Sequence, residues 1–353
     1  IIMSSSIEIL SKFKKLKKII NNTPKNEFCY RLIINDLVFL VLSVEKILRN
    51  RKYKKNIYLP ASKILDSLIF KLGEAKKMSD YSSNIKIKKR VKSESKVHQS
   101  LFQNLWIKFS DKQFQKDRLQ PYKIRVKLNK LIPLIKGKKC VDFGCGHGQF
   151  LMALKSYGAK SCLGLDFGKK SISFAKKISK KFGFGNKDLK YIYSKAQKTP
   201  LDSNSYDFAI QNGVFHHIEK YSDELKAYKE VHRVLKKNGY FFVFTQGLGG
   251  LRNIVFDNAQ EILRNIDQFF IVRTIRNLPI TNNKKYMLSD NLIAKYRNTT
   301  WTKIRKVLKE VGFRYVRPLR GHASTDFDKY FTSDKLFKKK VGEGHIRLLC
   351  QKI

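Results

Sequence analysis

The chain has 353 residues, of which 42% are hydrophobic and 29% are charged. This balance supports a sizeable folded core and argues against a largely disordered chain. The formal net charge of +46 suggests nucleic-acid binding as one hypothesis. However, 57 of the 74 basic residues are lysines, and the excess is spread along the whole chain. We therefore interpret the charge as a compositionally biased, solvated surface and do not favour nucleic acid as the partner.

Cysteine spacing and hydropathy narrow the class of protein further. The five cysteines are scattered and form no Cys-x-x-Cys pair, which argues against a disulfide framework and a zinc cluster. No apolar run reaches the roughly 18–20 residues of a membrane span, and the first residues do not resemble a secretory signal. We expect a cytoplasmic protein without a metal site, and its oligomeric state is not readable.

The first part of the chain is predicted to be helical. Residues 1–78 carry apolar residues at helical spacing among many lysines, and we expect a basic helical N-terminal region. Residues 79–96 are rich in serine and lysine and lack periodicity, so we interpret them as a linker. A further helix is expected over His98–Phe114, at the start of a domain spanning residues 97–353.

The pattern then changes to short apolar runs that alternate with helical segments, which predicts an α/β fold. We expect a doubly wound, mostly parallel sheet with helices on both faces, closed by two late strands. The predicted strands are Lys139–Phe143, Ser161–Asp166, Leu189–Tyr193, Tyr206–Gln211, Tyr240–Gln246, Tyr315–Leu319 and His345–Gln351.

Residues 248–300 interrupt this alternation. They begin with a glycine-rich entry and continue with helical runs. An insertion at this point of a doubly wound sheet would stand above the carboxyl ends of the strands, where ligands bind. We interpret it as a lid over the acceptor, with a purely structural cover as the alternative.

A glycine loop connects the first predicted strand to the next helix. It reads Val141-Asp-Phe-Gly-Cys-Gly-His-Gly148, with Asp142 just before the loop. A dinucleotide-binding loop would need glycine at position 149, which is glutamine here, and the Lys-Ser/Thr ending of a phosphate-binding loop is absent. A carboxylate at this place would repel a pyrophosphate but would suit a ligand that carries an ammonium group.

A second carboxylate, Asp166, ends the second predicted strand, beside the glycine loop. In this position it can accept hydrogen bonds from both hydroxyls of a ribose. The ligand implied has a ribose and a positive charge but no phosphate, and S-adenosylmethionine fits this description. The alternative is that Gly144, Gly146 and Gly148 only form a tight turn.

At this point the sequence resembles the class I, seven-stranded S-adenosylmethionine-dependent methyltransferases, and most of all the branch of ubiquinone and menaquinone biosynthesis. The resemblance covers about residues 120–247. It rests on the glycine loop, Gly164-Leu-Asp166 and the three segments Thr199–Phe208, Gly213–Ile218 and Glu230–Gly239.

The resemblance implies roles for individual residues. Asp142 would lie near the methionine ammonium, and Asp166 would hold the ribose hydroxyls. The segment from Gly144 through Cys145 and Gly146 to Gly148 would pass under the methionine and the ribose. Phe167 would lie against the adenine, with Ala196 and Gln197 nearby, and Gln211 would line the methionine end. The family usually has an acidic residue at the position of Lys195, and lysine cannot accept a hydrogen bond from the adenine amine.

Methyl transfer from a sulfonium requires alignment of donor and acceptor, and a base when the acceptor must lose a proton. His216 and His217 follow the fourth predicted strand and are the candidate bases, and His217 matches the position that is most often histidine in the family. The alternative is that one of them packs or caps the following helix.

The motifs of two classes of nucleic-acid base methylases are absent, and this narrows the kind of methyl acceptor. The segment after the fourth strand reads Gln211-Asn-Gly-Val, without the Asn/Asp-Pro-Pro-Tyr of enzymes that methylate exocyclic amines of bases, and the Pro-Cys nucleophile of cytosine methylases is absent. We therefore expect transfer to an oxygen or nitrogen of a small-molecule or lipid-like acceptor. The alternatives are an RNA methyltransferase that docks through residues 1–78, and a non-catalytic binding module.

Overall fold

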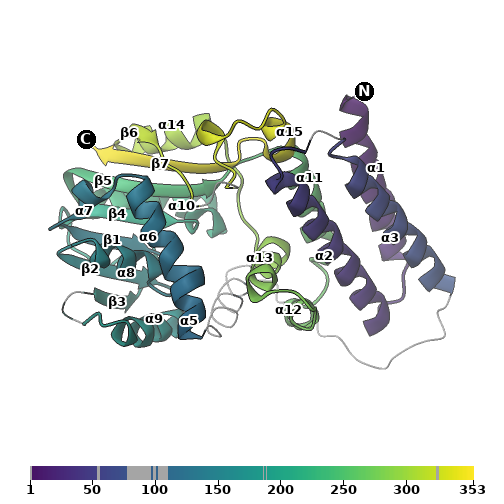
Figure 1. Cartoon of the computed structure of the whole chain (residues 1–353), viewed down its shortest axis with the longest axis horizontal. Coiled ribbons are helices and arrows are strands. Elements are labelled where there is room, and N and C mark those ends of the chain that lie inside the picture. The colour runs from purple at the N-terminus through teal and green to yellow at the C-terminus, as the bar shows by residue number, and fades with distance from the viewer. Residues whose placement is uncertain are drawn as a thin grey trace. The chain divides into compact units, whose positions relative to one another are not determined.

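The computed structural model describes residues 2–53, 56–77, 97, 101, 110–185, 187, 189–322 and 326–353. The chain forms two compact units (Figure 1), and each is assembled from three separate stretches of sequence. Unit 1 contains residues 1–97, 248–295 and 333–342, and unit 2 contains residues 98–247, 296–332 and 343–353. The expected linker 79–96 and most of the helix expected over His98–Phe114 lie outside the described residues.

Unit 1 is built from helices in the part of it that the structure describes. The helical character predicted for the N-terminal region is confirmed, since apolar residues at helical spacing become the buried faces. Its helices are α1 (Ile2–Asn21), α2 (Glu27–Arg49), α3 (Leu59–Lys77), α11 (Gly250–Leu263), α12 (Gln268–Arg276), α13 (Asn282–Ile293) and α15 (Phe337–Val341). None of the described helices combines the length and the apolar character needed to cross a bilayer.

Polar contacts join the three stretches of unit 1. The buried Lys340 ammonium lies 2.5 Å from a carboxylate oxygen of Asp334 and donates a hydrogen bond of 2.8 Å to the Asn50 carbonyl oxygen. Lys17 forms an ion pair of 2.6 Å with Glu261. The insertion after the fifth strand is thus part of the same compact unit as the N-terminal helices, and its suggested action as a lid stays a proposal.

Unit 2 contains a seven-stranded sheet with the order β3-β2-β1-β4-β5-β7-β6 (Figure 1). The strands β1 to β5 pair in parallel, and β7 is antiparallel to both β5 and β6. The predicted doubly wound, mostly parallel fold is confirmed. The strands are β1 (Lys139–Phe143), β2 (Ser161–Asp166), β3 (Leu189–Tyr193), β4 (Tyr206–Asn212), β5 (Leu235–Gln246), β6 (Phe313–Pro318) and β7 (His345–Lys352).

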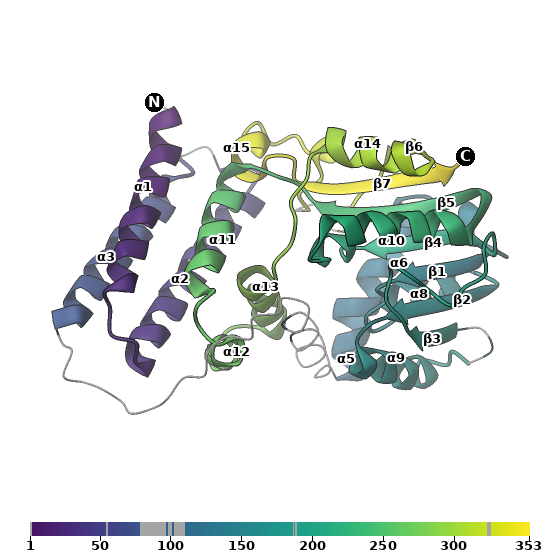
Figure 2. The same cartoon turned by 180° about the vertical axis from the view of Figure 1, so that it is seen from behind.

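Helices cover both faces of this sheet. A helical stretch formed by α5 (Asp111–Phe114), the π-helix η2 (Gln115–Leu119) and α6 (Gln120–Leu128) leads through α7 (Ile132–Ile135) into β1. α6, α8 (Gln149–Ser156) and α9 (Lys169–Lys181) cover one face, and α10 (Tyr221–Val234) and α14 (Trp301–Val311) cover the other (Figures 1 and 2). The second face contains a core of Val, Leu, Ile and aromatic side chains. Two short 3₁₀ helices, η3 (Phe215–His217) and η4 (Lys329–Phe331), complete the unit.

The strand order explains where a ligand can bind. The chain runs from β1 outward to β3 and then returns to the other side of β1 with β4. Connections on the two sides of this reversal diverge and leave room at the carboxyl ends of β1 and β4. The glycine loop follows β1 at this point.

Candidate active site

The three glycines of the loop after β1 all have left-handed backbone conformations, with φ values of 85° at Gly144, 53° at Gly146 and 77° at Gly148. A Cβ atom on Gly148 would lie 2.0 Å from the Tyr191 hydroxyl oxygen, and one on Gly144 would lie 2.5 Å from Val214. No described atom lies within 4 Å of the corresponding point at Gly146. Gly144 and Gly148 therefore allow close packing, whereas Gly146 leaves backbone open to a ligand.

Asp142, the second-last residue of β1, is almost completely buried, with 2% of its surface exposed. Its Oδ1 atom has no hydrogen-bond partner among the described residues. Burial, and next the negative charge of Asp166, raise the pKa of this carboxyl well above its usual value. A buried carboxylate without a donor is costly, so the atom is suited to a positively charged or N–H-bearing ligand.

Asp166 lies at the end of β2, and its carboxylate is oriented by the loop itself. Oδ2 accepts a hydrogen bond of 3.0 Å from Gly146 N–H, and Oδ1 accepts one of 2.8 Å from Gly168 N–H. Burial raises the pKa of this carboxyl, and the two backbone hydrogen bonds oppose the rise. Each oxygen keeps a lone pair for a further donor, as the predicted binding of two ribose hydroxyls requires.

The residues expected around the adenine follow β2 and β3. Phe167 is half-buried beside Asp166, and Ala196 and Gln197 are half-buried in the turn after β3. Ser194 N–H donates a hydrogen bond of 3.0 Å to the Asp166 carbonyl oxygen and joins the two strand ends. Lys195 is exposed.

Two predicted cofactor residues have side chains directed into the protein. Cys145 is buried, with its sulfur against Gly164, so its backbone, and not its side chain, forms the surface of the glycine loop. Gln211 is fully buried; its Nε2 donates a hydrogen bond of 3.0 Å to the Phe244 carbonyl oxygen, and its Oε1 accepts from Val214 N–H. Gln211 thus braces the loop after β4.

The two neighbouring histidines differ in their surroundings. His216 is buried; its Nδ1 accepts a hydrogen bond of 3.3 Å from Gln246 N–H and lies 3.2 Å from Thr245 Oγ1. These contacts join η3 to β5 and favour a structural role for His216. His217 is half-buried, with its ring centroid 4.4 Å from that of His216 and 6.0 Å from that of Tyr296.

Other motif residues maintain the fold. Glu230 on α10 accepts hydrogen bonds from Thr199 N–H (2.8 Å) and Oγ1 (2.6 Å), and it pairs with Arg233 at 2.7 Å. Burial alone would raise the pKa of Glu230, but the hydrogen bonds from Arg233 and Thr199 lower it below its usual value. These contacts fix the segment between β3 and β4.

A group of side chains from the helices before β1 was not among the predicted site residues. Tyr122 on α6 packs against Phe150, and its hydroxyl accepts a hydrogen bond of 3.2 Å from Asn212 at the end of β4. Burial would raise the pKa of Tyr122, but the positive charges of Arg118 and Arg125 outweigh it and lower the pKa. The only sequence feature that pointed to these residues is that their helix lies shortly before β1 along the chain.

His147, inside the glycine loop, was also missed. It is buried against Phe174, with ring centroids 4.6 Å apart. Burial, and next the positive charge of Arg118, lower its pKa to about 3, so the ring is neutral at physiological pH.

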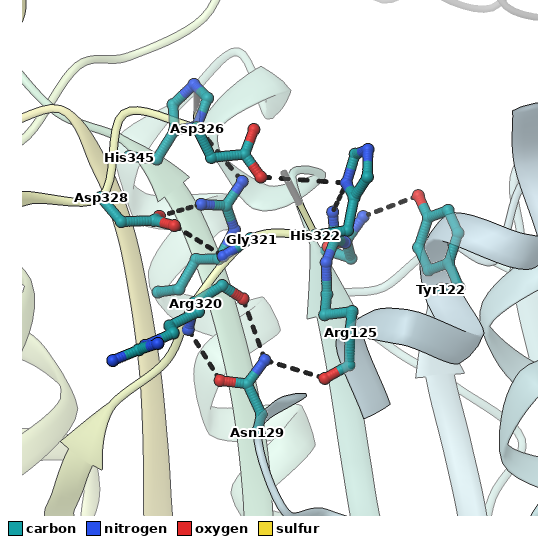
Figure 3. A network of polar contacts seen from close by, with 11 residues as sticks. Tyr122, Arg125, Asn129, Arg320, Gly321, His322, Asp326, Asp328 and His345 are labelled. Atoms are coloured by element: carbon teal, nitrogen blue, oxygen red, sulfur yellow. Dashed lines mark hydrogen bonds and ion pairs between the residues drawn. The ribbon is translucent and has the colours of Figure 1, made fainter. Parts of the chain in front are cut away.

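Arg125 belongs to a polar network at the carboxyl ends of β4 and β5 (Figure 3). Its Nη1 donates a hydrogen bond of 2.9 Å to Asn212 Oδ1, and its Nη2 lies 3.5 Å from His322 Nδ1. Asn129 joins the Arg125 carbonyl oxygen to the Arg320 backbone, which places the segment after β6 beside α6.

Comparisons with known proteins address the region around this site. Residues 141–243 match a family model described as a methyltransferase domain. The demethylmenaquinone methyltransferase of Staphylococcus epidermidis is 30% identical over 106 residues, covering 30% of this chain and 41% of that protein. The tRNA (carboxymethyluridine(34)-5-O)-methyltransferase of Schizosaccharomyces pombe is 29% identical over 172 residues, covering 47% of this chain and 65% of that protein.

Among solved structures, a SAM-dependent methyltransferase from Aquifex aeolicus is similar, with a TM-score of 0.42, 17% identity and coverage of 70% of this chain and 100% of that chain. The chain spans about half the length of the first curated relatives that it matches.

Proposed function

We propose that this chain, whose residues 141–243 match a methyltransferase domain, transfers a methyl group from S-adenosylmethionine to an oxygen or nitrogen of a small-molecule or lipid-like acceptor. The donor would lie over the glycine loop, with its ribose at Asp166 and its ammonium group at Asp142.

The buried Asp142 carboxylate is the observation that carries this proposal. Its Oδ1 has no donor among the described residues, and it lies before a loop whose central glycine has open space beside it. The Asp166 oxygens are both oriented by backbone N–H groups. This donor set fits a ligand with an ammonium group and a ribose, and two carboxylates disfavour a phosphate ligand.

The protein's own contribution to the chemistry is alignment and control of a proton. A sulfonium carries a good leaving group, so methyl transfer needs an acceptor atom held in line with the methyl carbon. His217 is the candidate base for an acceptor that must lose a proton. His216 would hold the position of η3 through its contacts with β5.

Two kinds of acceptor have support. A relative named as a demethylmenaquinone methyltransferase supports a lipid-like acceptor, and the absence of a base-methylase motif after β4 agrees with it. A relative named as a tRNA methyltransferase supports RNA as the second candidate. We favour the lipid-like acceptor, since an excess of lysine alone is evidence for association with polyanions and not for methylation of RNA.

Calorimetric titration with S-adenosylhomocysteine, the demethylated product, tests the donor site. We expect saturable binding to the wild type, and Asp166→Ala should weaken it by about 1–3 kcal/mol because two hydroxyls lose their acceptor. Absence of binding at millimolar concentration would refute the proposal. Incubation with methyl-labelled S-adenosylmethionine and either a lipid extract or total RNA then distinguishes the two acceptors by which fraction becomes labelled.

A further inference from the structure

The Arg125 guanidinium is buried without a carboxylate partner. Only 6% of the residue is exposed, and within the described residues no acidic oxygen lies within the 4.0 Å of an ion pair. Among the described residues, its contacts are the neutral Asn212 amide, the His322 ring and the Tyr122 ring, whose centroid is 4.7 Å away. Its Nε has no hydrogen-bond partner among the described residues.

A second buried guanidinium nearby provides a contrast. Arg347 on β7 forms an ion pair with Asp328, whose other oxygen accepts a hydrogen bond of 2.6 Å from Gly321 N–H (Figure 3). This arrangement is the usual one for a buried cation, because desolvation of a charge costs several kcal/mol unless a counter-charge is close. Burial, and next the positive charge of Arg347, lower the pKa of Arg125. Asp326 and Asp328 oppose this lowering from beyond ion-pair distance, and the Nε of Arg125 is left without an acceptor.

The location of Arg125 separates it from the ribose end of the donor site. Its partner Asn212 ends β4, and Arg347 lies on β7, whereas Asp166 ends β2 on the other side of β1. A donor that extends from Asp166 to Asp142 occupies the ends of β2 and β1. With the donor there, the next strand ends along the sheet, those of β4 and β5, are left for the acceptor.

We propose that the methyl acceptor carries a carboxylate group that is anchored by the Arg125 guanidinium. This inference rests on the proposed function. A planar carboxylate matches the fork of N–H groups of arginine, and Nε offers the unused donor. Asp326 and Asp328 lie in the same cluster and disfavour a doubly charged phosphate (Figure 3). The outermost contact is His322, whose side chain is 37% exposed, so this corner of the network borders solvent.

Benzoate is the probe for this site, with inorganic phosphate for comparison. The full chain, saturated with S-adenosylhomocysteine, is titrated with each anion while the arginine Nε–H resonances are followed by NMR. We expect benzoate to shift the Arg125 signal saturably and more tightly than phosphate. Arg125→Gln should weaken benzoate binding by about 10-fold or more, since a desolvated ion pair is lost. Lys127→Gln, an exposed change on the same helix, should leave it unchanged.

A second variant keeps the test independent of the stability of Arg125→Gln. Asn212→Asp places a carboxylate at the 2.9 Å contact with Arg125 Nη1. This carboxylate should compete with benzoate for the guanidinium and lower the affinity for benzoate by about 10-fold, although Arg125 is still present. If the wild type binds no benzoate, or if both variants bind it as the wild type does, the proposal is wrong.

The carboxylate of the donor's methionine part is the other group that Arg125 could bind. If Arg125 bound that carboxylate, Arg125→Gln would lower the affinity for S-adenosylhomocysteine by about 10-fold or more. The affinity for 5′-methylthioadenosine, which lacks the amino-acid part, would not change. That result would overturn the proposal. We expect both nucleosides to bind the variant within about 3-fold of the wild type. Failure of the wild type to bind either nucleoside would instead refute the proposed function.

Discussion

Replacement of Asp142 by asparagine should weaken the binding of S-adenosylhomocysteine and at the same time stabilise the ligand-free protein. The substitution keeps the shape of the side chain and removes its charge. In the ligand-free protein the carboxylate is buried and its Oδ1 has no donor. In the complex that we propose, the same oxygen accepts a hydrogen bond from the ligand's ammonium group.

The magnitudes follow from these two environments. Loss of a hydrogen bond to a charged group costs about 1.5–3 kcal/mol, which corresponds to roughly 10- to 150-fold in affinity. Removal of an uncompensated buried charge should raise stability by about 1 kcal/mol, or about 2–4 °C in Tm for a domain of this size.

The stability gain should depend on pH with a definite sign. Burial raises the pKa of Asp142 in the folded protein above its unfolded value, so the folded state binds the proton more tightly. The wild type therefore loses stability as the pH rises above the unfolded pKa of about 3.9. The Tm difference between Asp142→Asn and the wild type should be small near pH 4 and should grow toward pH 7.

Calorimetry with S-adenosylhomocysteine and 5′-methylthioadenosine, together with thermal unfolding, checks these expectations. The second ligand lacks the ammonium group, so its affinity should not change. Asp202→Asn, a change of an exposed aspartate, is the control. Equal affinity of Asp142→Asn and the wild type for S-adenosylhomocysteine would refute the assigned role, and an equal loss for both ligands would indicate a distorted loop.

Three further predictions concern the loop, the histidines and the segment held by α10. Gly148→Ala should destabilise the protein by about 1–3 kcal/mol in chemical denaturation because its Cβ has no room, whereas Gly146→Ala should cost about 1 kcal/mol and mainly weaken S-adenosylhomocysteine in calorimetry. His217→Ala should lower turnover by about 10²–10⁴-fold with unchanged donor affinity, and His216→Ala should mainly lower Tm; unaffected turnover in His217→Ala would exclude it as the base. Glu230→Gln should lower Tm at pH 7, and the gap to the wild type should narrow as the pH falls through the lowered pKa of Glu230, since protonation then removes the same contacts.

Local sequence patterns predicted the sheet well. Each of β1, β2 and β3 is a short apolar run with the bounds expected from the sequence, because such runs are bordered by turn residues and helix ends. β5 begins at Leu235 rather than at Tyr240, since Leu235 pairs with Tyr206 across an irregularity in the ladder. That pairing depends on a neighbouring strand and has no local signal.

The parts that were not predicted depend on contacts between distant residues. The apolar face of α11 predicts that the helix is buried but not that α1 and α2 contact it. Arg125, Asn212 and His322 meet only after folding, and each alone is an ordinary polar residue. The sequence identified His216 and His217 as a pair, and only the contacts with Thr245 and Gln246 distinguish them.

The assembly of both units from three stretches has a consequence for biosynthesis. Unit 1 needs residues 333–342, and the sheet of unit 2 needs β7, which lies between β5 and β6. At ribosomal rates of about 5–20 residues per second, the N-terminal helices emerge roughly 10–50 s before the last residues of their own unit. Unit 1 therefore cannot be completed before residues 333–342 have been synthesised, and the sheet of unit 2 cannot be completed before β7 has been synthesised.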